Sequence, residues 1–274
     1  MKPSTNASWA LITGASAGIG KEFAQQLAAA GYHLVLTARR RDRLETLADE
    51  LKQAHGIETR IIVADLADPK APTAITKEIE GAGIALEVLV NNAGYGVAGK
   101  LTAVEWKTHQ DFIQVMMTAV VELCYLLLPL MRRQQYSAII NVASLAGLVP
   151  GSAGHTLYGA AKSFLIRFSE SLHLENEEFG VRVQALCPGF TYSEFHDVVG
   201  TRDQVSRMPD YMWQSAEEVV RESLEKAGQD NALPVLVSGR VNRMISRLVR
   251  WMPMRSAYNM VRKRSRQFRA DQPK

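Results

Sequence analysis

The sequence is poor in cysteine and histidine, and it contains no apolar run long enough to cross a membrane. Two cysteines, Cys124 and Cys187, among 274 residues give no disulfide framework, which favours a reducing compartment. The six histidines are scattered without metal-ligand spacing, so we expect no bound metal. The longest apolar stretch, 119–131, contains Glu122 and Pro129, and we interpret it as a buried helix.

The first residues, MKPSTNASWALITG, contain no apolar core of signal-peptide length and run directly into a strand-like segment. We therefore expect a soluble, cytoplasmic protein. A hydrophobic content of 47% over 274 residues is enough to bury a sizeable core. It fits one large α/β domain better than two small ones.

Short β-rich runs alternate with longer amphipathic segments along residues 1–239. Strands are expected over 9–14, 32–39, 59–66, 86–94, 137–144, 181–189 and 233–239. They are rich in Val, Ile and Leu with little alternation, which indicates that both faces of the sheet are covered. The pattern predicts a single Rossmann-type α/β domain: a doubly wound, mostly parallel seven-stranded sheet flanked by helices on both faces. Ligands of such sheets bind at the carboxyl ends of the strands.

The first predicted strand ends in the glycine-rich segment TGASAGIG, which leads into a helix. Gly14, Gly18 and Gly20 permit a tight turn and let backbone N–H groups approach a pyrophosphate at the helix N-terminus. An ordinary glycine-rich turn is the alternative, because such turns are common. The position after the first strand of a long alternating series favours a dinucleotide site.

The second predicted strand ends in Ala38, Arg39, Arg40 and Arg41, where dinucleotide-binding folds usually place an acidic residue for the ribose. Guanidinium groups suit a 2′-phosphate, and no carboxylate is there to repel one. The segment therefore predicts NADP rather than NAD, with Arg39 as the phosphate contact. Arg40 and Arg41 also fit the solvated start of a basic helix.

The segment YGAAK opens an apolar helix-like stretch and places Tyr158 and Lys162 four residues apart, on one helix face. A free tyrosine has a pKa of about 10, and a nearby ammonium favours the phenolate and lowers that pKa. Such a pair can exchange protons with a substrate. The alternative is an interfacial tyrosine beside a lysine that reaches out to solvent.

Five motifs follow one another along the chain: TGASAGIG, NNAG at 91–94, the serine that ends IINVAS, YGAAK, and CPGFTYSEF at 187–195. This ordered set resembles the classical short-chain dehydrogenase/reductase family over about residues 8–239. The resemblance implies that Ser144, Tyr158 and Lys162 are catalytic. In that family the tyrosine donates a proton to the substrate carbonyl oxygen, and the nicotinamide delivers hydride to the carbon. The serine bonds the same oxygen, and the lysine also holds the nicotinamide ribose.

The same resemblance assigns the remaining cofactor contacts. Asp65 corresponds to the adenine contact, and Asn91 to a residue that stabilises the central strands near the ribose. Thr191 and Ser193 are placed to bond the carboxamide or the phosphates, although relatives often have Thr at the second position. The expected NADP(H)-binding residues are Gly14, Ser16, Gly18, Ile19, Gly20, Arg39, Asp65, Asn91, Gly94, Tyr158, Lys162, Pro188, Gly189, Thr191 and Ser193. Family members usually form homodimers or homotetramers through two long helices, here about 103–134 and 158–179.

One residue departs from the family pattern. Family members usually carry a catalytic Asn in the long helix, and alignment on LLLPLM puts Met116 there. A thioether is a weak acceptor and no donor, so it cannot replace the Asn directly. In the family this Asn holds a water that connects the lysine to a proton relay. Three interpretations follow: the relay uses other groups here, the helix is shifted, or the chain is an NADP-binding regulator or scaffold with little turnover. Because the other three catalytic residues are kept, we favour the enzyme.

The segment 190–213 is long for a strand-to-helix connection, which suggests a lid over the substrate. Its apolar residues would form a wall for an apolar ketone, aldehyde or alcohol, or they would only anchor the lid to the body. Tyr95, after NNAG, is expected to face the same cavity. The wall residues are Phe190, Tyr192, Phe195, Met208, Tyr211, Met212 and Trp213.

Residues 240–274 are expected to form a basic C-terminal extension. Between Arg240 and Arg269 there are ten Lys or Arg and no Asp or Glu. The last five residues are neutral in sum, so a net charge of +4 leaves residues 1–239 at −6. Ile245, Leu248, Val249 and Met252 would form one apolar stripe beside arginines. Such a helix lies on an anionic membrane surface, or it packs over the substrate cleft or a neighbouring subunit. No recognition motif supports a nucleic-acid partner.

Overall fold

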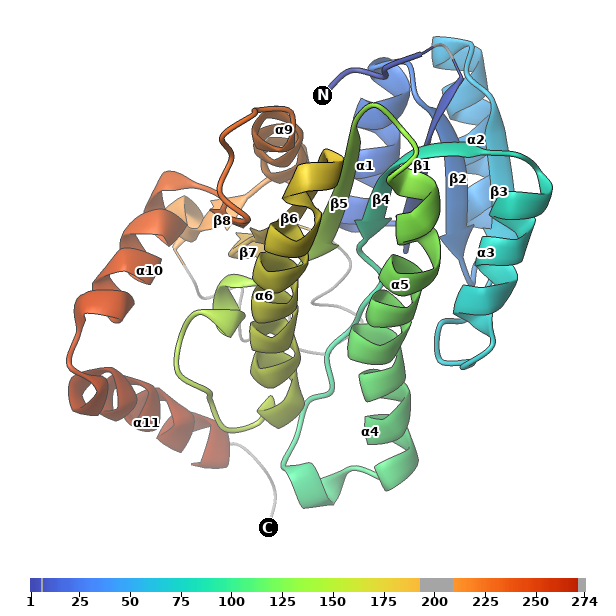
Figure 1. The fold of residues 1–274 in the computed structure, drawn as a ribbon. Helices are drawn as coiled ribbons and strands as arrows, with labels where there is room; N and C mark the ends of the chain where they lie inside the picture. Colours follow the sequence, from blue (N-terminus) through green and yellow to red (C-terminus); the bar gives the residue numbers. More distant parts are fainter. Residues whose placement is uncertain (6, 193–208, 271–274) are drawn as a thin grey trace.

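A sheet of seven parallel strands forms the centre of the molecule, in the order β3-β2-β1-β4-β5-β6-β9 (Figure 1). The computed structural model describes residues 1–5, 7–192 and 209–270. The chain runs outward from β1 to β3, returns to pair β4 with β1, and then runs outward to β9, as a doubly wound sheet does. The strands are β1 (Ser8–Thr13), β2 (His33–Ala38), β3 (Thr59–Val63), β4 (Ala85–Asn91), β5 (Ser137–Val142), β6 (Val181–Cys187) and β9 (Val235–Val237). The predicted fold class is confirmed.

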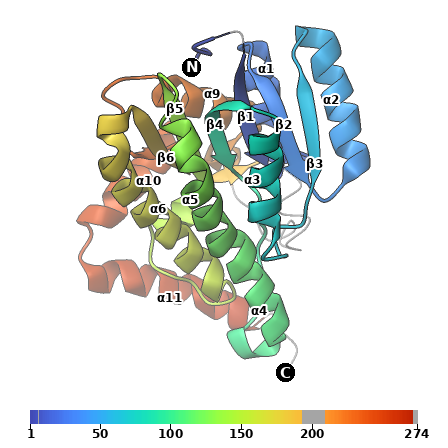
Figure 2. The ribbon, with the colours of Figure 1, turned by 45° about the vertical axis from the view of Figure 1, so that its right-hand side comes forward.

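Helices cover both faces of this sheet, as Figure 2 shows. Neighbouring residues of β1 belong to two different cores: Ala10 and Ile12 pack on one side, Leu11 on the other. Both faces are therefore apolar, which explains why the strands lack alternation. One face carries α1 (Gly18–Ala29), α2 (Arg41–His55) and α9 (Ala216–Ala227), and the other carries α3 (Ala71–Gly81), α5 (Ala119–Met131) and α6 (Thr156–Asn176).

The first long helix is interrupted. It consists of α4 (Trp106–Ile113), the π-helical segment η2 (Gln114–Thr118) and α5. Within the described ranges, Trp106–Met131 is the one helix long and apolar enough to cross a membrane. Leu123, Leu127 and Met131 on α5 are completely buried and pack in the core of the α3–α5–α6 face. The helix is therefore longer than the 119–131 run, so the expectation that no apolar stretch is long enough to span a bilayer was wrong. The expected burial holds for α5, which packs in the core.

A second, two-stranded parallel sheet joins both ends of the predicted lid. β7 (Phe190–Thr191) pairs with β8 (Trp213–Gln214), so residues on either side of 193–208 lie next to each other. The predicted wall residues Phe195 and Met208, and the predicted cofactor contact Ser193, lie outside the described residues. Short 3-10 turns complete the fold: η1 (Leu101–Ala103), η3 (Leu145–Gly147), η4 (Glu177–Phe179) and η5 (Asp210–Met212).

The basic extension folds into α10 (Arg240–Trp251) and α11 (Met254–Ala270). Asn242 of α10 is 3% exposed and donates to the Ser238 carbonyl at 2.9 Å. On α11, the Ser265 hydroxyl accepts a bond from the Ala153 N–H at 3.2 Å. The boundary expected at residue 239 is therefore crossed by contacts, and the extension is attached along the body.

The four residues expected to form one apolar stripe on α10 differ in burial. Ile245, Val249 and Met252 are half-buried, but Leu248 is 60% exposed. A helix turns about 100° per residue, which puts Leu248 on the outer side with Met244 and away from Val249. The apolar face of α10 is therefore wider than its buried part, and the edge that carries Leu248 and Met244 is exposed.

Candidate active site

The glycine-rich segment forms the turn between β1 and α1, at the carboxyl edge of the sheet. Gly14 and Gly18 have φ angles of 66° and 53°, which favour glycine. Ala17 precedes α1, and within the described residues no side chain caps the helix. Its first-turn N–H groups therefore face a position suited to an anionic group.

Gly20 explains why this loop cannot carry larger residues. A Cβ on Gly20 would lie 2.3 Å from the Gly14 carbonyl oxygen and 2.4 Å from the Asn92 Nδ2. That amide group donates to the Thr13 carbonyl at 3.0 Å, and the Thr13 hydroxyl accepts from the Asn92 N–H at 2.9 Å. Thr13 and Asn92 thus clamp the loop onto β4. The sequence reading missed both, although they lie inside the TGASAGIG and NNAG motifs.

Two arginines and an aspartate lie at the carboxyl ends of β2 and β3. The Arg40 guanidinium donates to the Ser16 hydroxyl at 2.9 Å and so reaches the glycine-rich loop itself. Arg39 lies 3.9 Å from the Asp65 carboxylate, and both side chains are exposed. Arg40, which also fitted a solvated helix start, is therefore a second cation at this end of the site, beside Arg39. The loop, the uncapped helix and these cations fit a nicotinamide dinucleotide.

Asn91 has a supporting position behind the site. It is 3% exposed and donates to the Asn141 amide oxygen at 2.9 Å, which links β4 to β5. Asn141 in turn donates to the Ser169 hydroxyl on α6 at 2.9 Å. The chain of bonds fixes the central strands relative to α6, which carries the predicted catalytic tyrosine and lysine.

The three predicted catalytic residues lie together where β5 ends and α6 begins. Ser144 caps η3 by accepting from the Ala146 N–H at 3.1 Å, and its hydroxyl is hydrogen-bonded to Tyr158. The Lys162 ammonium is buried, donates to the Val142 carbonyl at 2.6 Å and lies 5.7 Å from the centre of the Tyr158 ring. Two hydroxyls and a cation therefore converge on one position at the carboxyl edge of the sheet.

Burial dominates the ionisation of this cluster. It raises the pKa of Tyr158 to about 12, against the opposing effect of the hydrogen bond from Ser144. It also lowers the pKa of Lys162 to about 8. The lowering of the Tyr158 pKa that was expected from the lysine is not found, because desolvation of the phenolate outweighs the favourable effect of the Ser144 hydrogen bond.

The turn after β6 forms the wall behind the site. The Pro188 carbonyl accepts from the Leu145 N–H at 2.9 Å, which joins this turn to the Ser144 segment. A Cβ on Gly189 would lie 2.4 Å from the Asn242 side chain, so α10 packs directly against the turn. The Thr191 hydroxyl donates to the Gly189 carbonyl at 3.3 Å. Asn242 was not singled out in the sequence, since no motif marks a tail residue that returns to the sheet.

Aromatic residues stack where the predicted lid joins the body. Tyr192 stacks on Trp213 with ring centres 4.7 Å apart, and Phe190 lies 5.6 Å from the same indole. Tyr95 packs edge-on against Phe112 at 5.6 Å. The rings of Phe190, Tyr192 and Trp213 thus join β7 to β8.

A family model described as short chain dehydrogenase matches residues 8–203, which carry the glycine-rich loop, Ser144, Tyr158 and Lys162. The chain belongs to the short-chain dehydrogenase/reductase family. A 7beta-hydroxysteroid dehydrogenase of Collinsella aerofaciens is 30% identical over 81% of this chain and 83% of its own length. A human very-long-chain 3-oxoacyl-CoA reductase is 30% identical over 92% of this chain and 79% of its own.

Solved structures of the family agree with this assignment and differ in cofactor. A short-chain dehydrogenase from Sphingobium yanoikuyae in complex with NADPH has 27% identity and a TM-score of 0.76, covering 97% of this chain and 96% of that one. One from Burkholderia phymatum in complex with NAD has 24% identity and a TM-score of 0.78, covering 88% and 92%. The similarity to the Burkholderia phymatum protein, at 24% identity, shows a shared fold alone. Members of the family therefore bind NADP or NAD.

Met116, which departs from the family pattern, is a packing residue. It is 1% exposed and belongs to a small core with Phe112 and Ala161, against which Tyr158 packs. A Cβ on Gly94 would lie 2.8 Å from its sulfur, so Met116 fills the space beside that glycine. The residue lies within the π-helical segment η2, and such segments occur frequently at functional sites.

Proposed function

We propose that this short-chain dehydrogenase/reductase is an NADP(H)-dependent enzyme that interconverts an apolar ketone or aldehyde and the corresponding alcohol. The proposal rests on the convergence of Ser144, Tyr158 and Lys162 at the carboxyl edge of the sheet. When bound, the cofactor supplies a hydride to the carbonyl carbon. The chain's own residues supply the proton, the hydrogen bonds and the positions of both reactants.

Each catalytic residue has a separate task in the reduction. The Tyr158 hydroxyl donates its proton to the carbonyl oxygen, and its high pKa keeps that proton in place until transfer. The Ser144 hydroxyl donates a hydrogen bond to the same oxygen as negative charge develops there. The Lys162 ammonium stabilises the tyrosinate left behind. In the oxidation, the tyrosinate takes the proton back from the alcohol.

The pKa of Lys162 predicts a pH dependence. Because burial lowers this pKa to about 8 while Tyr158 stays protonated to about 12, the lysine is the first of the two groups to lose its proton as pH rises. We expect kcat/KM for NADPH to fall about tenfold per pH unit above pH ~8, since this parameter reports the free enzyme. Initial rates between pH ~6 and ~10 measure it. A profile that stays level to pH ~10 contradicts the assignment.

Arg40 is expected to determine the preference for NADP over NAD, together with Arg39. Replacing Arg40 with Gln removes a charged donor, worth about 1.5–3 kcal/mol, from the end of the site where a 2′-phosphate fits. We expect the Kd for NADPH to rise at least tenfold and the Kd for NADH to stay within about twofold. Arg41→Gln is the matched control, because Arg41 instead pairs with Glu45 at 3.6 Å. Equal losses for both cofactors would contradict this role.

The substrate class follows from the lid anchors and the relatives. Aromatic residues gather where the lid segment joins the body, and the two named relatives act on a hydroxysteroid and on a very-long-chain 3-oxoacyl-CoA. We therefore propose a bulky apolar carbonyl substrate. The test is NADPH consumption with steroid ketones, long-chain 3-oxoacyl thioesters and small polar aldehydes. Turnover of the polar aldehydes alone would contradict the proposed class.

A regulator or scaffold with little turnover is the second candidate function, and Met116 is its motivation. On our proposal the side chain of Met116 only packs. Met116→Leu should therefore keep kcat within about twofold, because a volume-conserving apolar change is tolerated. Met116→Asn should lose about 1–3 kcal/mol of unfolding free energy, since the buried amide lacks a partner there. Negligible turnover of the parent with every carbonyl, together with large activation by Met116→Asn, would favour the regulator.

We further propose a homodimer or homotetramer. Large apolar side chains are exposed on the helices that family members use for assembly: Trp106 is 65%, Tyr125 77% and Leu174 72% exposed. Exposed apolar residues on adjoining helices suit a self-complementary interface.

A further inference from the structure

The outer face of α10 and the start of α11 carry large apolar side chains that are mostly exposed within the described structure. We call this surface the tail face and define it by Met244, Leu248, Trp251, Met254 and Tyr258. These side chains are 64%, 60%, 86%, 87% and 59% exposed, respectively. The two helices project from one side of the molecule (Figure 1). Exposed apolar patches of this kind mark interaction sites.

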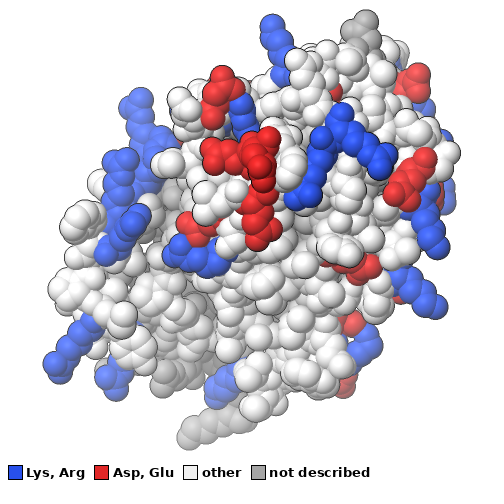
Figure 3. Space-filling model, viewed as in Figure 1, with Lys and Arg blue, Asp and Glu red and all other residues white. Residues whose placement is uncertain are grey.

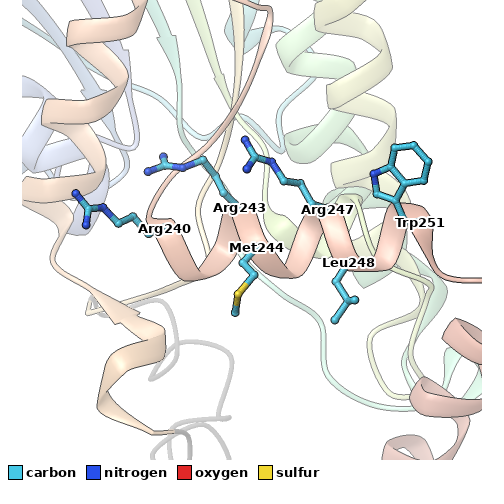
Figure 4. Close-up of a pocket in the computed structure, with 6 residues that line it drawn as sticks. All are labelled: Arg240, Arg243, Met244, Arg247, Leu248 and Trp251. Carbon is cyan, nitrogen blue, oxygen red and sulfur yellow. The ribbon is translucent and has the colours of Figure 1, made fainter.

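Arginines lie beside this apolar row. Arg240, Arg243 and Arg247 line an open groove of about 480 Å³ together with Met244, Leu248 and Trp251. In Figure 4 the three arginines and Trp251 point to one side of α10, and Met244 and Leu248 point to the other. Arg243 is partly neutralised by Glu222. The arginines at 240, 247, 250 and 255 form no ion pair in the described part of the chain. Figure 3 shows blue side chains projecting from the left edge, where α10 and α11 lie.

The charge distribution restricts what can cover this face. Residues 240–269 hold ten basic and no acidic side chains, while residues 1–239 carry −6. A second copy docked face to face would bring like charges together, because a two-fold interface repeats the same patch. A free polyanion would neutralise the arginines but leave the indole and thioether groups in water. An anionic lipid surface would bind both the apolar side chains and the arginines. The apolar side chains would lie at the acyl boundary, and the guanidinium groups would lie at the phosphates.

We propose that the tail face docks the protein peripherally on an anionic lipid surface. The attachment of α10 supports this role, because Asn242 packs against the turn at Gly189 and the Arg243–Glu222 ion pair ties the helix to α9, which leaves the apolar row outward. Docking by this face requires neither turnover nor a particular cofactor, so it stands independently of the proposed enzymatic function.

The test uses the full chain with vesicles of defined composition. Co-sedimentation with phosphatidylglycerol vesicles is expected at about 0.02 M salt, with at least tenfold weaker binding at about 0.5 M salt and on phosphatidylcholine. Tryptophan emission should shift to the blue on binding, and Trp251→Phe should remove most of that shift. Absence of sedimentation with phosphatidylglycerol at low salt, for protein that remains folded, would overturn the proposal.

Paired variants locate the binding to the tail face. Leu248→Ser with Trp251→Ser removes apolar contact, and Arg247→Glu with Arg250→Glu reverses charge. Each pair should lower vesicle partitioning at least tenfold. The controls are Leu233→Ser, at a site that is 79% exposed elsewhere, and Arg133→Glu. They should change partitioning by less than about twofold.

Three further results would overturn the proposal. Tail variants that still bind as the parent does would exclude this face. A parent that self-associates without vesicles, in a way abolished by Trp251→Ser, would assign the face to a second copy. Binding to heparin as strong as to vesicles, and unaffected by the apolar pair, would assign it to a soluble polyanion. Unfolding curves measured for every variant separate these outcomes from misfolding.

Discussion

Tyr158→Phe is expected to lower kcat for carbonyl reduction by about 10²- to 10⁴-fold, which is the range that a positioned general acid contributes. The change removes the hydroxyl that is hydrogen-bonded to Ser144 and that we propose as the proton donor. The ring remains, so its packing beside Met116 is retained. The Kd for NADPH should therefore stay within about twofold, and the unfolding free energy should fall by only about 1 kcal/mol for the lost hydrogen bond.

Tyr125→Phe is the control for this loss. Tyr125 lies on α5 and is 77% exposed, so removing its hydroxyl should leave kcat unchanged. Steady-state rates at saturating NADPH, with the Kd taken from fluorescence titration, separate chemistry from binding. If Tyr158→Phe keeps more than about one tenth of the parent kcat, the proton comes from another group and the proposed mechanism is wrong.

Gly20→Ala is expected to disrupt the cofactor loop. The new Cβ would lie 2.3 Å from the Gly14 carbonyl oxygen, and neither this backbone atom nor the clamped Asn92 amide can yield without moving the turn. The cost is at the upper end of the ~1–3 kcal/mol typical of overpacking. NADPH affinity should fall at least tenfold, because the N–H groups of the turn lose their common direction.

Gly81→Ala provides the comparison for this prediction. Gly81 ends α3, has no atoms within 4 Å of its added Cβ and shows no positive φ angle. Alanine there should be neutral or stabilise the protein by up to about 1 kcal/mol, and NADPH should bind normally. Urea unfolding and cofactor titration measure both variants. Equal behaviour of Gly20→Ala and Gly81→Ala would show that the loop tolerates a side chain.

The positions of the strands could be predicted from the sequence because they depend on local chemistry. Runs such as VLV in β4 are apolar on both faces, and alternation with helical segments leaves a doubly wound parallel sheet as the favoured arrangement. Tyr158 and Lys162 were predicted to share a helix face from their spacing alone, which α6 confirms. The periodicity of apolar residues within each segment and the order of the motifs therefore determined the fold and the family.

Tertiary structure alone decided the features that depend on long-range contacts. Arg40 reaches Ser16 across 24 residues, and Thr13 is bonded to Asn92 across 79 residues. Neither contact has a local signature. The pKa of Tyr158 likewise depends on how much water the surrounding elements exclude, so burial reversed the shift that its neighbour in sequence suggested.

The C-terminal extension has some properties that its sequence determined and others that only the tertiary structure decided. Its composition determined that it is basic and helical, since those properties depend on the residues themselves. Which side of α10 meets the body was decided by Asn242 and Arg243, whose partners Ser238 and Glu222 are brought there by β9 and α9. An amphipathic sequence fixes the spacing of its apolar residues, but the side that is buried depends on the surface that the rest of the chain presents.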